Sequence, residues 1–106
     1  MKMLVYALKD TVAGAASRPL FYESDSVAMR GFKLGVMNQE SGNPLGQHPQ
    51  DFILYRVGEF DDGTMQLVPC DPIKVMTGSE ALAARTEELA EIERLRGSIA
   101  EIEGAS

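Results

Sequence analysis

Four basic and aromatic residues have types and spacing that suit contact with a single nucleic-acid strand. Arg30 and Lys33 are three residues apart in a segment predicted to be helical. Tyr55 and Arg56 are adjacent in a predicted strand. Cationic side chains pair with phosphates, and aromatic rings give bases a surface on which to stack. We therefore predict a nucleic-acid-binding site made of Arg30, Lys33, Arg56 and Tyr55.

The overall charge favours the alternative, in which these residues are ordinary solvated charges beside core aromatic rings. The 106 residues carry 16 acidic and 10 basic side chains, a net charge of −6. Binding to phosphates is driven by Lys and Arg. The acidic excess is concentrated in residues 79–106, with seven acids and three bases, so residues 1–78 can still form a locally basic face. Tyr6 and Tyr22 are further candidates for stacking.

Residues that commonly carry catalysis or bind metals are scarce. His48 is the only histidine and Cys70 the only cysteine. A metal site needs several convergent ligands, and a nucleophilic cysteine needs a nearby base and a lowered pKa. We expect His48 to serve a turn before Pro49, and Cys70, flanked by prolines, to be a small buried residue. The sequence thus predicts no enzymatic activity, metal or cofactor, and a small enzyme using His48 or Cys70 is the alternative.

The elements that would position the basic residues follow from apolar periodicity. Residues 3–8 are continuously apolar and predict a buried central strand. Residues 10–18 predict a loop, and residues 19–22 a short extended piece along a sheet edge. A helix is predicted from Ser24 or Asp25 to about residue 38, because both residues are good N-caps. The face predicted to pack on the sheet consists of Ala28, Met29, Phe32 and Val36.

The second half of the chain predicts a strand, a hairpin and a return strand. In the strand over residues 52–60, Tyr55 alternates with Arg56, so their side chains point to opposite faces, and Phe60 is predicted to share the face of Arg56. Residues 61–64 predict a hairpin turn in which Gly63 supplies a positive φ. This explains the local acidic residues better than a calcium loop, which requires spaced oxygen ligands. Residues 65–68 then return along an edge, interrupted by two prolines, and residues 73–76 form one more short strand.

A second helix is predicted from residue 79 to about residue 103, with residues 77–79 as a hinge. Its apolar residues recur close to a heptad pattern, which favours pairing with a copy of itself over packing back on its own domain. The predicted oligomerisation residues are Leu89, Ile92, Leu95, Ile99 and Ile102. The predicted fold is therefore α+β: a small, mostly antiparallel sheet packed by one helix in β-α-β-β order, plus a long C-terminal amphipathic helix. We divide it into a core domain, 1–77, and a helix, 78–106.

Several segments resemble the small non-structural protein of gokushovirus-type microviruses, phages with single-stranded DNA genomes. They are residues 1–10 (MKMLVYALKD), 27–38 (VAMRGFKLGVMN), 48–63 (HPQDFILYRVGEFDDG) and 67–72 (LVPCDP). The resemblance implies a non-enzymatic DNA-binding protein that helps the switch from double-stranded replication to single-strand synthesis and packaging. The partners that it implies are single-stranded DNA and viral replication or capsid proteins. The apolar row of the C-terminal helix adds further copies of the chain itself as expected partners.

Location and partners can also be predicted from what the chain lacks. No apolar run reaches membrane-spanning length, and the opening residues do not have the pattern of a signal peptide. We therefore expect no membrane association and a place in the cytoplasm of the infected bacterium. An assembly or adaptor protein, which binds a viral or host protein through the sheet edge and the C-terminal helix, is the alternative function.

Overall fold

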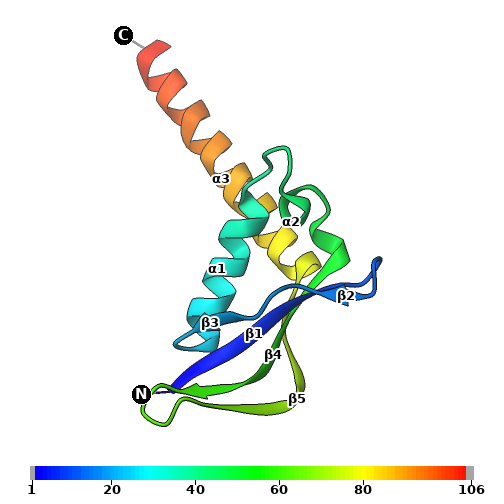
Figure 1. Ribbon diagram of the computed structural model, residues 1–106. Coiled ribbons are helices and arrows are strands. Elements are labelled where there is room, and N and C mark those ends of the chain that lie inside the picture. The colour runs from blue at the N-terminus through cyan, green and yellow to red at the C-terminus, as the bar shows by residue number, and fades with distance from the viewer. Residues whose placement is uncertain (1, 105–106) are drawn as a thin grey trace.

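The computed structural model describes residues 2–104, except for the side chains of residues 98–104 (Figure 1). Within this part, a five-stranded antiparallel sheet is combined with helices, which confirms the predicted α+β class. The elements in chain order are β1 (Lys2–Asp10), β2 (Ala15–Ala16), β3 (Leu20–Tyr22), α1 (Asp25–Met37), α2 (Pro44–Gln47), η1 (Pro49–Asp51), β4 (Phe52–Asp61), β5 (Gln66–Thr77) and α3 (Gly78–Gly104).

The sheet is built around β1, as its continuous apolar sequence predicts. The strand order is β2-β1-β4-β5, and β3 pairs with β1 beside β2. Val5 and Tyr6 of β1 are buried. The edge piece predicted over residues 19–22 is confirmed as β3, whereas β2 forms inside a segment predicted to be a loop. Two alanines there pair with the end of β1, so backbone hydrogen bonding to an open strand edge outweighs their low strand propensity.

A β-bulge in β4 changes the face on which its last residues lie. Val5 and Tyr6 are adjacent in β1, and they pair with Gly58 and Arg56 of β4. β4 therefore contains one extra residue, Val57, between these two pairs. An extra residue reverses the alternation of side chains beyond it. Phe60 therefore lies on the face of Tyr55, and the prediction that placed it with Arg56 is wrong.

The β4–β5 hairpin differs from its prediction in two respects. The residue with positive φ is Met65 (φ 59°), whereas Gly63 is not in that region. Gly63 instead donates its backbone N–H to Asp61 Oδ1 at 2.9 Å, so the side chain of Asp61 shapes the turn. The return strand is one edge strand rather than two short ones, because irregular register with β4 accommodates its prolines. Cys70 is exposed on this edge, so the expectation that it is buried is wrong.

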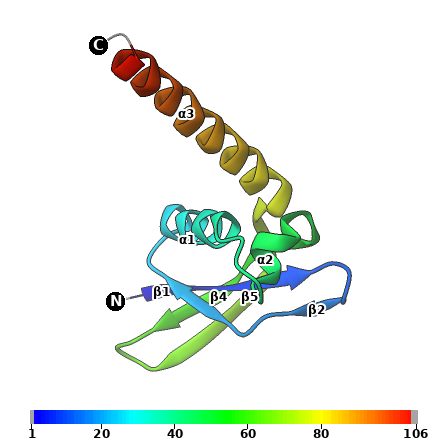
Figure 2. The same ribbon diagram turned by 90° about the horizontal axis from the view of Figure 1, so that it is seen from above.

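All helices of the described chain lie on one face of the sheet (Figure 2). α1 begins where the N-cap prediction placed it, with Ser24 Oγ accepting the backbone N–H of Val27 at 3.3 Å. Its buried stripe packs on β1 and β4, and Met29 lies at the margin of this core. The buried core consists of Tyr6, Ala28, Phe32, Val36, Leu54, Met76 and Ala81. The sheet face without helices is called the open face below.

α3 begins at Gly78 and confirms the predicted long helix. Its first turns contact α1 and η1, and the rest extends away from the sheet (Figure 1). The molecule is consequently elongated, with extents of 64 × 33 × 21 Å. Leu89, Ile92 and Leu95 are exposed and do not pack back on the domain. The side chains of Ile99 and Ile102, which the sequence places in the same row, lie outside the described residues.

Candidate nucleic-acid interface

Arg56 lies on the helix-covered face and forms an intramolecular ion pair with Asp25. Its Nη1 donates to both carboxylate oxygens of Asp25, at 3.1 and 3.0 Å. The Tyr6 hydroxyl donates to Asp25 Oδ1 at 2.5 Å. Burial raises the pKa of the Tyr6 hydroxyl well above its ordinary value, and the carboxylate of Asp25 adds to that shift while Arg56 opposes it. The guanidinium charge is therefore balanced locally by Asp25.

Arg30 and Lys33 lie on the exposed flank of α1, as the helical spacing predicts. Together with Ser26 and Met29 they line a shallow hollow of about 250 Å³. No aromatic side chain lines this hollow among the described residues. It offers two cations to an anionic partner, without a surface on which a base could stack.

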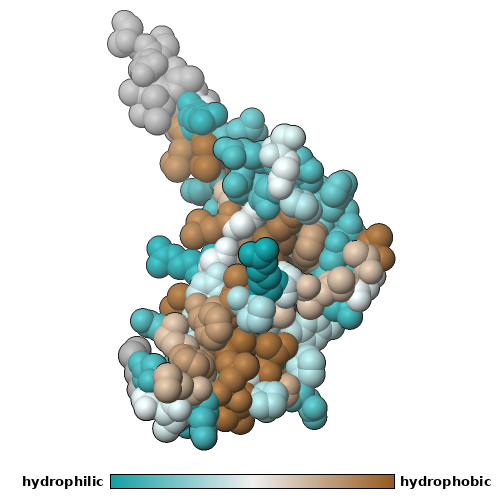
Figure 3. All heavy atoms as spheres, in the orientation of Figure 1, coloured by the Kyte–Doolittle hydropathy of each residue, from teal (hydrophilic) through white to brown (hydrophobic). Residues whose placement is uncertain are grey.

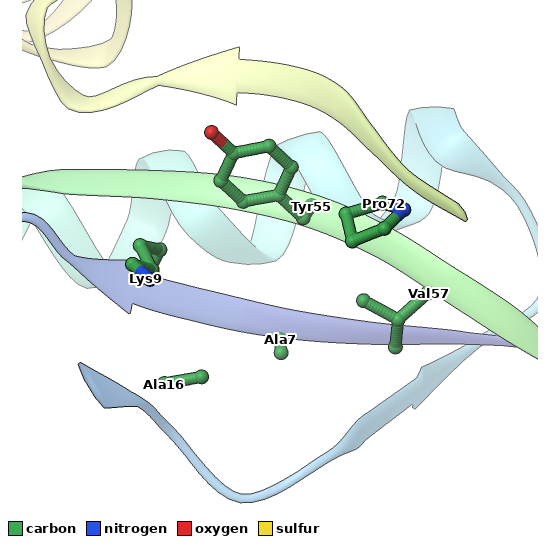
Figure 4. Close-up of a pocket in the computed structure, with 6 residues that line it drawn as sticks. All are labelled: Ala7, Lys9, Ala16, Tyr55, Val57 and Pro72. Atoms are coloured by element: carbon green, nitrogen blue, oxygen red, sulfur yellow. The ribbon is translucent and has the colours of Figure 1, made fainter. Parts of the chain in front are cut away.

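Tyr55 lies on the opposite side of the sheet, on the open face. A hollow of about 350 Å³ surrounds it, lined by Ala7, Lys9, Ala16, Tyr55, Val57 and Pro72. Figure 4 shows Tyr55, Val57 and Pro72 projecting around the small side chains of the two alanines. Because Ala7 of β1 and Ala16 of β2 have small side chains, the hollow has room for a flat group beside the Tyr55 ring.

Two lysines accompany Tyr55 on the open face. Lys74 of β5 is the direct cross-strand partner of Tyr55, and directly paired residues share a face. Lys9 lies in the lining of the hollow. Alternation along β1 predicts that Lys9 shares a face with Ala7. The position of Lys74 could not be predicted from the sequence, because a bulge in β5 changes its pairing with β4.

The rest of the open face is largely apolar. Phe21 of β3 meets Phe60 of β4 edge-on, with 6.1 Å between ring centroids. Leu67 is the cross-strand partner of Phe60 and is exposed. Figure 3 shows apolar side chains gathered over the part of the surface formed by the β4–β5 hairpin. This face thus combines aromatic rings and apolar side chains with the two lysines.

The four residues predicted from sequence do not form one surface. Arg56 is paired internally, Arg30 and Lys33 flank α1, and Tyr55 lies across the sheet. Their role in binding nucleic acid stays a prediction. His48 takes the predicted turn position between α2 and η1, with its N–H donating to Pro44 O at 2.8 Å. In the part of the chain that the structure describes, no group of three or more potential metal ligands occurs, and no helix is long and apolar enough to cross a membrane.

Comparison with known proteins identifies the family. No curated protein and no solved structure matches the chain. The model of the Phage ORF5 protein family matches residues 3–81. This span runs from β1 into the first turn of α3, and it contains the open face, α1 and Ala81, the buried residue of that first turn. The chain therefore belongs to the Phage ORF5 protein family.

Proposed function

We propose that this phage protein binds single-stranded DNA weakly through its open face, and that it assists synthesis or packaging of a single-stranded genome in the infected bacterium. The observation that carries the proposal is the hollow in which Tyr55 lies beside Lys9, with Lys74 paired to Tyr55 across the strands. Bases that stack on an aromatic side chain contribute about 1–3 kcal/mol each. Lysines on either side of the ring supply the charge that phosphates require.

Geometry and charge both favour a single strand over a duplex. A base can stack on the Tyr55 ring only if it is not stacked between its neighbours in the nucleic acid. Unstacking a base costs little free energy in a single strand. The open face has one lysine in the lining of the hollow and a second across the strands from Tyr55, while the whole chain has a net charge of −6. Affinity should therefore be modest and strongly dependent on salt. The helix-covered face is less suited, because Arg56 is neutralised by Asp25.

Fluorescence anisotropy with a labelled single-stranded oligonucleotide, at low and physiological salt, tests this proposal, with duplex as the control. The variant Tyr55→Ala should weaken binding about tenfold, as loss of one stacked base predicts, whereas Tyr55→Phe keeps the ring and should retain affinity. The double variant Lys9→Glu and Lys74→Glu should abolish binding. Arg30→Glu with Lys33→Glu makes the same charge change on the other face and should have little effect.

The results separate the two faces clearly. If the Arg30 and Lys33 variant loses affinity and the Lys9 and Lys74 variant does not, the site belongs to the flank of α1. If the wild-type protein does not bind even at low salt, the proposed function is wrong.

A second candidate is an adaptor that binds a viral or host protein along the edge of β5. The observation in its favour is that Leu67, Val68 and Ile73 of this edge strand are exposed, and exposed apolar edge strands readily pair with other chains. Co-expression with the phage replication and capsid proteins tests it. Capture of one of them should fall when Val68 is replaced by Lys, and unchanged capture would exclude this edge.

A further inference from the structure

α3 is attached to the core by one face of its first turns. Ala81 is 1% exposed within the core. Arg85, one turn later, donates from Nη1 to the carbonyl oxygens of Val36 at 2.9 Å and Gly46 at 3.0 Å. Both carbonyls lie at helix C-terminal ends, where a cation is favourably placed. These contacts fix the direction in which the helix leaves the domain.

The same face continues beyond Arg85 as an apolar row. Leu89, Ile92 and Leu95 follow Arg85 at spacings of four, three and three residues, which keeps them on one side of a helix. Their exposed fractions are 46, 42 and 55%. Figures 1 and 2 show that this part of α3 projects away from the sheet and from α1. A charged helix of this length without packing contacts is marginally stable in water, so a partner along this row would stabilise it.

The charges on this part of the helix discriminate between partners. Residues 86–97 contain four acidic and two basic side chains. Nucleic acid and anionic lipid would both be repelled by this acidic excess. The charges are also unevenly distributed, since residues 86–91 carry three glutamates and no base, whereas residues 93–97 carry Glu93 together with Arg94 and Arg96. A helix with this pattern is complementary to a reversed copy of itself.

We propose that α3 pairs with α3 of a second copy in antiparallel orientation, through Leu89, Ile92 and Leu95. In that orientation the glutamate-rich half of each helix faces the arginine-bearing half of the other. A parallel pair would place glutamates against glutamates instead. Antiparallel pairing also holds the two acidic core domains at opposite ends of the helix pair, which reduces their mutual repulsion.

Light scattering coupled to size-exclusion chromatography of the full chain, loaded at about 100 µM so that even micromolar dimers form, tests the pairing. The variant Ile92→Glu places a charge in the apolar row and should convert the dimer to a monomer. Ala90→Glu is the matched control, because it makes an equal charge change about 200° around the helix and should remain dimeric. Circular dichroism should show an unchanged sheet and core in both variants. A monomeric wild-type chain, or a dimeric Ile92→Glu variant, would overturn the proposal.

Orientation is tested by electron spin resonance distances. With Cys70 replaced by Ser, a spin label is attached to a cysteine introduced at Thr86. A parallel pair brings the two labels within the spacing of packed helices, about 10 Å between axes. Antiparallel pairing near Ile92 should separate them by about 20 Å along the pair, at 1.5 Å per residue. A short distance would overturn the antiparallel assignment.

Discussion

At the scale of single residues, the Tyr6–Asp25–Arg56 cluster joins three elements. Tyr6 belongs to β1, Asp25 opens α1 and Arg56 belongs to β4. Hydrogen bonds to a charged group contribute about 1.5–3 kcal/mol each, and this carboxylate accepts from both of its neighbours. Asp25 also lies in the first turn of α1, where a negative charge is favourable. The cluster therefore determines how α1 lies on the sheet.

The Tyr6 hydroxyl makes stability depend on alkaline pH. Its pKa is raised in the folded protein, so in the unfolded chain it loses its proton first, near pH 10. Its contribution to stability is complete below that pH and is lost as the pH rises above it. Between pH 10 and 11, the free energy of unfolding should fall by up to about 1.4 kcal/mol more in the wild type than in Tyr6→Phe. Urea unfolding measures this, and Tyr55→Phe, on the open face, should behave as the wild type. Equal slopes for wild type and Tyr6→Phe would show that the hydroxyl is not held as described.

At the scale of elements, local sequence signals predicted those helices and strands whose formation depends on local interactions. The cap at Ser24 and the apolar stripe were enough to place α1, and the apolar run was enough to identify the central strand. The bulge at Val57 and the positive φ of Met65 were not predictable, because the first depends on pairing with β1 and the second on how the hairpin closes. A one-residue shift reverses a whole strand face, which is why Phe60 was misplaced.

Two glycines in α3 should respond in opposite ways to replacement by alanine. A Cβ on Gly78 would meet the carbonyl oxygen of Pro49 at the junction with η1, whereas nothing lies within 4 Å of a Cβ on Gly97. Gly78→Ala should lower the free energy of unfolding by about 3 kcal/mol, because backbone cannot move as a side chain can. Gly97→Ala should increase helicity, since alanine is favoured by up to about 1 kcal/mol in a helix. Urea unfolding and circular dichroism measure the two effects. A fully stable Gly78→Ala variant would contradict the close packing of α3 on η1.

At the scale of the whole molecule, the sequence predicted the face on which single residues lie better than which residues come together. Alternation placed Tyr55 and Arg56 on opposite faces, and helical spacing placed Arg30 and Lys33 on an exposed flank. The ion pair that engages Arg56 joins residues 31 apart in the chain, and the strand pairing that brings Lys74 to Tyr55 contains bulges. Such long-range contacts arise from the packed fold and leave no local pattern. The candidate site on the open face therefore became visible only in three dimensions.

The boundary between the core domain and α3 can be tested on the whole molecule by truncation. The sequence placed it after residue 77, but Ala81 and Arg85 of α3 pack on the core, and the family match extends to residue 81. A chain ending at Thr86 keeps both contacts, so it should unfold within about 1 kcal/mol of the monomeric Ile92→Glu variant. A chain ending at Thr77 loses the buried alanine and the charged hydrogen bonds of Arg85, and should be less stable by about 3 kcal/mol or more.

Urea unfolding at one low protein concentration makes this comparison, because dimerisation would otherwise add to the stability of the full chain. If the chain ending at Thr77 is as stable as the one ending at Thr86, the boundary predicted from sequence is correct and α3 is an independent appendage. If only the longer chain is stable, the first turns of α3 belong to the core. In that case Arg85 attaches the helix to the core, and the part of α3 beyond Arg85 is the segment available to pair with a second copy.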